Sequence, residues 1–151
     1  MAREEEPRAG RSATAELAQD EEVQGFLDRF AAALTGGDTA TVAGMWETPA
    51  LVLGDEMGQT VESRQEIERF FAGAKEDYNR RGITGTRADI QGLEWATERI
   101  AIVTVRWPYL DDGGRERGEE SSTYVLRRDD QGSLRLRVAV MRGMRGAAPS
   151  S

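Results

Sequence analysis

Two side chains have the type and position expected of a chemical site, Asp55 and Tyr124. The chain contains no His and no Cys, so neither an imidazole for proton transfer near neutral pH nor a thiolate nucleophile is available. Asp55 follows a short apolar stretch, and a carboxylate tilted into an apolar pocket becomes a better proton acceptor. Tyr124 lies in a predicted strand, where a buried phenol needs a hydrogen-bond partner. These two residues are the candidate catalytic pair, a base and a hydrogen-bond donor.

Each candidate also has a structural explanation. Asp55 stands in the stretch GDEMG, whose composition is typical of a solvated turn, and Tyr124 could simply fill the core. The acidic pairs at 111–112 and 129–130 adjoin glycines in predicted hairpins and lack the spacing of a calcium loop. The sequence also has no glycine-rich phosphate loop and no nucleophile elbow. We therefore expect no metal and no cofactor.

A second group of candidates would line an apolar cavity for a small apolar or aromatic ligand. Its members are aromatic or long apolar side chains at helical or strand spacing, for which core packing is the alternative: Phe30, Trp46, Phe70, Phe71, Tyr78, Trp107, Tyr109 and Met141. Arg137 would join them if it points inward to hold a carboxylate or phenolate. The alternative for Arg106 and Arg137 is a cross-strand ion pair with Glu119 or Glu120, which is favoured for Arg106.

The elements that must position these residues begin with helices. Apolar side chains recur at steps of three and four from Val23 to Leu34, which predicts a helix that ends at Gly36 and Gly37. Asp38 is a typical N-cap for a second helix whose apolar side ends at Trp46, before Thr48-Pro49. A small hairpin is expected at 50–61. Ser63 and Glu66 form a capping box that begins a third helix, which the pattern carries through to about residue 80.

From residue 84 onward the apolar period changes to two. This predicts four strands, at 84–95, 100–110, 118–128 and 133–144, joined by short turns into an antiparallel meander. In the second of them Ile102 and Thr104 alternate with Val103 and Val105, so both faces are partly apolar. Helices on one face and another subunit on the other would account for this pattern. We therefore expect a homodimer formed through the sheet.

Composition limits the class of protein. A chain of 151 residues with 38% apolar residues suits one folded domain, expected at 20–145 between disordered tails at 1–19 and 146–151. A net charge of −7 disfavours a nucleic-acid partner. No apolar run has the length of a membrane span and no signal peptide is visible, so we expect a cytoplasmic protein without membrane contact.

The order helix, helix, hairpin, helix, four strands resembles the nuclear transport factor 2-like superfamily. The Gly37-Asp38 corner, the aromatic Trp46 and the stretch DDQGSLRLRV at 129–138 are similar to the ketosteroid isomerase-like and polyketide cyclase-like (SnoaL-like) branch. The resemblance implies an α+β fold, a cystatin-like cone with three helices packed on a curved antiparallel sheet. It also implies a pocket between the helices and the sheet.

The same resemblance assigns roles by position. The phenol of the isomerases is matched by Phe30, their base by Gly54 or Asp55, and their carboxyl by Tyr124. Epoxide hydrolases of the superfamily imply a different set, Arg137 with Asp55 and Glu120. Three functions stay open: a domain that binds a small apolar molecule, an isomerase, cyclase or hydratase-type enzyme, and a dimerisation or partner-binding module.

Overall fold

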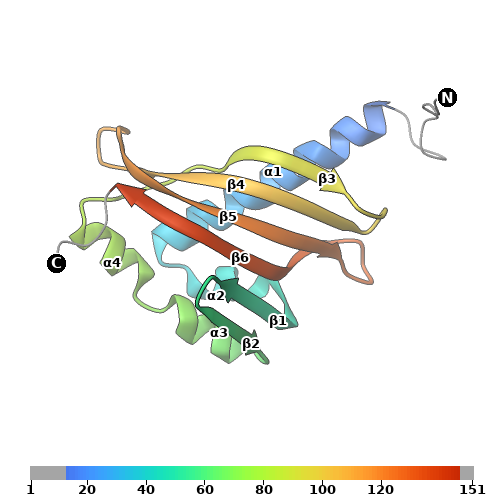
Figure 1. Ribbon diagram of the computed structural model, residues 1–151, viewed down its shortest axis with the longest axis horizontal. Helices are drawn as coiled ribbons and strands as arrows, with labels where there is room; N and C mark the ends of the chain where they lie inside the picture. Colours follow the sequence, from blue (N-terminus) through green and yellow to red (C-terminus); the bar gives the residue numbers. More distant parts are fainter. Residues whose placement is uncertain (1–12, 147–151) are drawn as a thin grey trace.

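The computed structural model describes residues 13–146, which form four helices and six strands (Figure 1). The helices are α1 (Ala13–Gly36), α2 (Thr39–Gly44), α3 (Arg64–Phe71) and α4 (Ala74–Arg80). The strands are β1 (Trp46–Gly54), β2 (Met57–Val61), β3 (Asp89–Trp95), β4 (Ile100–Leu110), β5 (Glu116–Arg128) and β6 (Leu134–Gly146). Within these bounds, no helix is long and apolar enough to cross a membrane.

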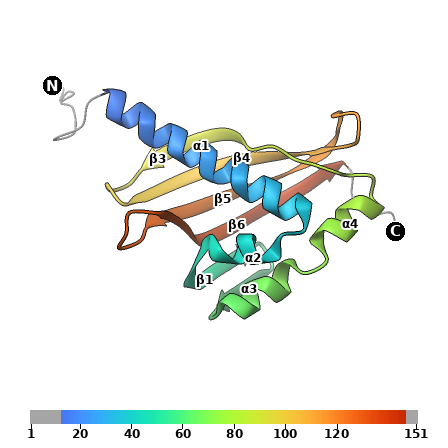
Figure 2. The ribbon, with the colours of Figure 1, turned by 180° about the vertical axis from the view of Figure 1, so that it is seen from behind.

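The strands form one curved sheet in the order β2-β1-β6-β5-β4-β3. The predicted meander β3-β4-β5-β6 is antiparallel throughout, and the hairpin β1-β2 joins it through a parallel pairing of β1 with β6. Figures 1 and 2 show the helices on one face of this sheet, with α1 crossing the strands obliquely. The predicted α+β, cystatin-like architecture is confirmed.

Helix α1 begins earlier than its apolar stripe. The stripe starts at Val23, yet the helix starts at Ala13, so residues 13–19 are its first turns and not part of a tail. This stretch consists mostly of Ala, Glu, Leu and Gln, which have high intrinsic helix propensity and therefore favour a helix even where it does not pack against the core. Residues 1–12 and 147–151 of the two predicted tails lie outside the described residues.

The second helix is shorter than its pattern suggested. Asp38 caps it as predicted, because its side chain accepts a hydrogen bond from Thr41 N at 3.1 Å. The helix ends at Gly44, however, and Trp46 begins β1, where it pairs with Leu136 of β6. The pairing is interrupted between Trp46 and Leu51, around Pro49, which has no N–H to donate to a neighbouring strand.

The predicted third helix is divided into α3 and α4. Its capping box forms with one change of partner, since Glu66 N donates to Ser63 Oγ at 3.2 Å while Glu62 N donates to Glu66 Oε1 at 2.8 Å. The break falls at Gly73, whose φ of 84° is left-handed and is accessible to glycine at little cost. The break sets α4 at a new angle, beside the strand ends near Tyr109.

The core lies between the helices and the concave face of the sheet. Phe26, Leu27 and Phe30 of α1 are buried against alternate residues of β4, among them Val103 and Val105. The opposite face carries Ile102 and Arg106. Arg106 makes the predicted ion pair with Glu119 and further pairs with Asp89 and Glu116. Alternate residues of β4 therefore point to opposite faces of the sheet, as expected from a period of two.

Candidate cavity between the helices and the sheet

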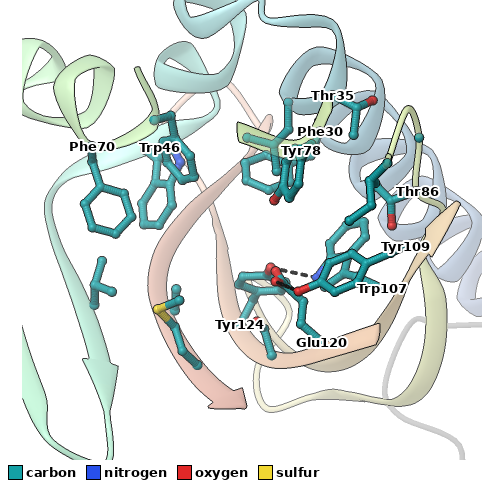
Figure 3. Close-up of a pocket in the computed structure, with 18 residues that line it drawn as sticks. Phe30, Thr35, Trp46, Phe70, Tyr78, Thr86, Trp107, Tyr109, Glu120 and Tyr124 are labelled. Carbon is teal, nitrogen blue, oxygen red and sulfur yellow. Dashed lines mark hydrogen bonds between the residues drawn. The ribbon is translucent and has the colours of Figure 1, made fainter. Parts of the chain in front are cut away.

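A cavity of about 160 Å³ remains in the core between the helices and the sheet (Figure 3). Eight of its lining residues are aromatic, and they come from α1, β1, α3, α4, β4 and β5. The lining residues are Phe30, Leu34, Thr35, Trp46, Val52, Phe70, Phe71, Tyr78, Ile83, Gly85, Thr86, Trp107, Tyr109, Glu120, Ser122, Tyr124, Ala139 and Met141. Phe70 and Met141 are 42% and 46% exposed, which places them at the mouth.

Hydrogen bonds organise the polar wall of the cavity. Trp107 Nε1 donates to Tyr124 Oη at 2.9 Å, and Tyr109 Oη donates to Glu120 Oε1 at 2.8 Å. The pairing of β4 with β5 sets Trp107 opposite Glu120. Alternation along β5 turns Glu120, Ser122 and Tyr124 to the same side. Among the described residues that line the cavity, Glu120 alone carries a formal charge.

The phenols of this wall stay protonated near neutral pH. Burial raises the pKa of Tyr124 to about 12, against the opposing effect of its hydrogen bonds with Ser122 and Trp107. Burial, and then the negative charge of Glu120, raise the pKa of Tyr78 and of Tyr109. The phenol of Tyr124 accepts the Trp107 N–H and keeps its own proton, so it can donate a hydrogen bond.

A guanidinium packs against two of the cavity phenols near α4. The Cζ atom of Arg81 lies 5.5 Å from the ring centroid of Tyr78 and 5.4 Å from that of Tyr109, within the range of a cation–π contact. Arg81 also pairs with Asp77 at 3.3 Å. These contacts fix the two phenol rings, whose centroids are 6.3 Å apart.

Trp46 forms part of the opposite, apolar wall. Its side chain is buried, and among the described residues its Nε1 has no hydrogen-bond partner. Its ring centroid lies 6.1 Å from that of Phe71. In Figure 3 Trp46 stands next to Phe70 and away from Tyr124, Tyr109 and Glu120.

The structure brings nine of the eleven candidate site residues to this cavity. They are Tyr124 and the whole apolar group predicted from spacing: Phe30, Trp46, Phe70, Phe71, Tyr78, Trp107, Tyr109 and Met141. Glu120 was considered as an ion-pair partner and in the set with Arg137 and Asp55, but not as a partner of Tyr124, and Thr35, Thr86 and Ser122 were not considered. The signal for Glu120 was present, because it is four residues before Tyr124 on a strand and must share its face.

Asp55 does not line the cavity. It is exposed in the β1-β2 turn and borders a shallow depression together with Glu120, Met141 and Arg142. Alternation along β1 turns Val52 inward, and the next inward position is Gly54, which has no side chain. The inward position at the end of β1 therefore carries no carboxylate.

Arg137 also lies outside the cavity lining. Its Nε donates to the carbonyl oxygen of Pro49 at 2.7 Å, and its Nη1 pairs with Glu47 at 3.4 Å. These partners hold it on the outer side of β6, since Leu136 is buried in the core. The set of Arg137 with Asp55 and Glu120, expected from the epoxide hydrolases, does not assemble.

No group of three or more acidic side chains within residues 13–146 is placed to hold a metal ion. The carboxylates of Asp89, Glu116 and Glu119 surround Arg106 and are used in its ion pairs. The functional groups of the side chains that line the cavity are one carboxylate, three phenols, three aliphatic hydroxyls and two indole rings.

This cone with a hollow between helices and sheet is the architecture of the NTF2-like proteins. The sequence profile of the family described as NTF2-like protein (DUF6841) matches residues 19–143, and the chain belongs to this family. No curated protein matches the chain.

Solved structures share the fold at low sequence identity. A candidate scytalone dehydratase from Novosphingobium aromaticivorans superposes with a TM-score of 0.67 at 14% identity, over 93% of this chain and 94% of that one. An NTF-2 like protein of unknown function from Shewanella oneidensis superposes with a TM-score of 0.64 at 11% sequence identity, over 83% of this chain and 99% of that one. A ketosteroid isomerase-like protein from Erwinia carotovora superposes with a TM-score of 0.59 at 12% sequence identity, over 86% of this chain and 94% of that one. At these identities the likeness concerns the fold alone.

Proposed function

We propose that this protein binds a small, mostly apolar, planar molecule in the cavity, as the resemblance to the SnoaL-like branch implies. The observation that carries the proposal is a hollow of about 160 Å³ walled by eight aromatic side chains. Protein interiors are normally filled to the density of organic crystals. An engineered apolar cavity of about 150 Å³ stays dry and binds benzene. By that comparison this cavity accepts one substituted ring.

Ligand binding explains the cavity better than a partner-binding role does. A module that only recognises another protein has no need of an internal hollow, and unfilled core volume destabilises a fold. Phe70 and Met141 are partly exposed at the mouth of the cavity. The methionine side chain is flexible and polarizable, so it can move aside as a ligand enters and then pack against it.

Calorimetric titration with ethylbenzene tests the proposal. The unmodified full chain should bind it with a measurable heat. Ala139 is buried and faces the cavity, so Ala139→Leu should fill part of the hollow and weaken binding at least tenfold. Val140→Leu, on the other face of the same strand, is the matched control and should bind like the unmodified chain. No binding by the unmodified chain, or equal binding by all three, would overturn the proposal.

An enzyme of the isomerase, cyclase or hydratase type is the second candidate. It is favoured by one specific observation, a carboxylate and a hydrogen-bond donor on the same wall. Glu120 would take the role first considered for Asp55, accepting a proton from a carbon next to a carbonyl group. Tyr124 would donate a hydrogen bond to the enolate oxygen that develops. The proton then returns to carbon, so that no cofactor is needed.

Deuterium exchange tests this candidate. Cyclohexanone in heavy water should exchange its α-hydrogens faster with the unmodified chain than with buffer, and NMR measures the rate. Glu120→Gln should remove the acceleration, whereas Asp55→Asn should leave it unchanged. Exchange at the buffer rate with the unmodified chain would reject proton transfer and leave binding alone.

We also propose that a second copy of this chain covers the outer face of the sheet. Pairing sets Ile102, Val125, Val138 and Leu51 in one row across β4, β5, β6 and β1. An ion pair lies on each side of the row along the strands, Arg106 with Glu119 on one side and Arg127 with Glu47 on the other. An apolar row between mixed charges can pair with its own copy across a two-fold axis.

A further inference from the structure

Glu120 places a negative charge on the wall of the cavity without an ion-pair partner among residues 13–146. Its Oε1 accepts a hydrogen bond from Tyr109 Oη at 2.8 Å, and within the same range no donor reaches Oε2. Its neighbour Glu119, on the outer face, is paired with Arg106. Glu120 is half-buried, and a carboxylate partly withdrawn from water gains more from an opposite charge than an exposed one does.

Aromatic rings of the cavity lie around this charge. Burial, and after it the charge of Glu120, raise the pKa of Tyr78 and of Tyr109, and the same charge adds to the effect of burial on the pKa of Tyr124. The carboxylate is therefore close to all three cavity phenols. Trp107 is its partner across the pairing of β4 with β5. Aromatic ring faces attract cations, so rings and carboxylate together suit a positively charged group.

Arg81 does not occupy this place. It is not among the residues that line the cavity, and it pairs with Asp77 at 3.3 Å. Its Cζ lies 5.5 Å from the ring centroid of Tyr78 and 5.4 Å from that of Tyr109, yet both rings still line the cavity. Their cavity-facing surface therefore remains available to a ligand.

Glu120 stands where the cavity meets the protein surface. Glu120, Ser122 and Met141 line both the cavity and the shallow depression that Asp55 and Arg142 border. A cation bound at this point keeps part of its water shell, which lowers the cost of removing it from solvent. The depression has two carboxylates and one guanidinium, and the whole chain has a net charge of −7, so the approach favours cations over anions.

We propose that the ligand carries a protonated amine, which donates a hydrogen bond to Glu120 Oε2 while its aromatic ring occupies the cavity. The ligand class is then a single aromatic ring with an ammonium group on a short side chain. This inference rests on the proposed ligand-binding function and adds the charge of the ligand. In this role Glu120 is an ion-pair partner and not a base.

Three probes of similar size and different charge test the inference by calorimetry on the full chain: 2-phenylethylamine, 2-phenylethanol and phenylacetate. A primary alkyl amine is protonated near neutral pH, as lysine is. The amine should bind about tenfold more tightly than the alcohol, the gain expected for a hydrogen bond between two charged groups. Phenylacetate should bind more weakly than the alcohol.

Glu120→Gln removes the charge and keeps the shape of the side chain, so the ratio of amine to alcohol affinity should fall about tenfold to near one. Glu119→Gln is the matched control, because it removes a charge from the adjacent residue on the opposite face of β5. The ratio should survive this change.

The inference is overturned if the unmodified chain binds amine and alcohol equally, if phenylacetate binds as tightly as the amine, or if the preference persists in Glu120→Gln. Binding of ethylbenzene by the unmodified chain would stand in each of these cases, so the ligand-binding function would survive. If the unmodified chain binds neither ethylbenzene nor any of the three probes, both proposals fail.

A measurement on the unmodified chain covers the case in which Glu120→Gln does not fold. In the complex with 2-phenylethylamine, nuclear Overhauser effects report which protein rings lie next to each end of the ligand. The methylene next to the nitrogen should show them to the ring of Tyr109, and the phenyl ring should show them to Phe71. The reverse orientation would overturn the inference.

Discussion

Replacing Tyr124 by Phe removes one hydroxyl and leaves the ring in place. That hydroxyl accepts the N–H of Trp107 at 2.9 Å, and the two side chains are 6% and 5% exposed. Phe leaves the indole N–H buried without an acceptor, which costs about 1–3 kcal/mol, whereas the loss of volume is slight. For a domain of this length a loss of about 2 kcal/mol lowers Tm by about 6 °C.

Urea unfolding followed by tryptophan fluorescence measures the effect, and a double-mutant cycle with Trp107→Phe assigns it. Once the indole is absent, the hydroxyl of Tyr124 loses its donor, so the two changes should couple by about 1 kcal/mol. The reasoning would be refuted by a Tyr124→Phe protein within about 0.5 kcal/mol of the unmodified chain, or by fully additive changes.

Three further outcomes are expected. Ser63→Ala should destabilise the protein by about 1 kcal/mol in urea, since Ser63 Oγ caps α3, and an unchanged midpoint would contradict this. The pKa of Tyr124 is raised from 10.0 in the unfolded chain to about 12 in the folded protein. The Tyr124 phenol is therefore protonated in both states below pH 10, and above pH 10 it loses its proton first in the unfolded chain. The contribution of Tyr124 to stability should then fall by about 1.4 kcal/mol per pH unit from pH 10 towards 12. Because Tyr78 and Tyr109 shift in the same direction, this contribution is measured as the difference in slope between the unmodified chain and Tyr124→Phe, and equal slopes would contradict the assignment. Light scattering should give twice the mass of one chain, which is 16.7 kDa, and Val125→Glu should give a single chain; a monomeric unmodified protein would reject the dimer.

The sequence predicts the sheet better than it predicts the helices around it. Strict alternation in β4 identifies its buried face, because a period of two admits a single assignment once one face is apolar. Trp46 shows the limit of such patterns. Its spacing from Val42 fits a helix, yet parallel pairing with β6 takes it into β1, and that partner is about 90 residues away in the chain.

The candidate site was predictable in its apolar half and less so in its polar half. Aromatic residues at regular spacing had to face inward, and all of those proposed line the cavity. Whether they would fill the core or leave a hollow depends on the angle of α4 after Gly73, which no local pattern specifies. Asp55 was considered because it follows a strand, but alternation gives the inward position to Gly54 and leaves Glu120 as the cavity carboxylate.

The most direct test of the central claim is a crystal structure of the protein grown with ethylbenzene. The account predicts density for the ring inside the cavity, in contact with Phe30, Phe71 and Trp107, with the surrounding side chains close to the positions described. A cavity closed by inward movement of Phe70 or Phe71, with no density between the helices and the sheet, would contradict it.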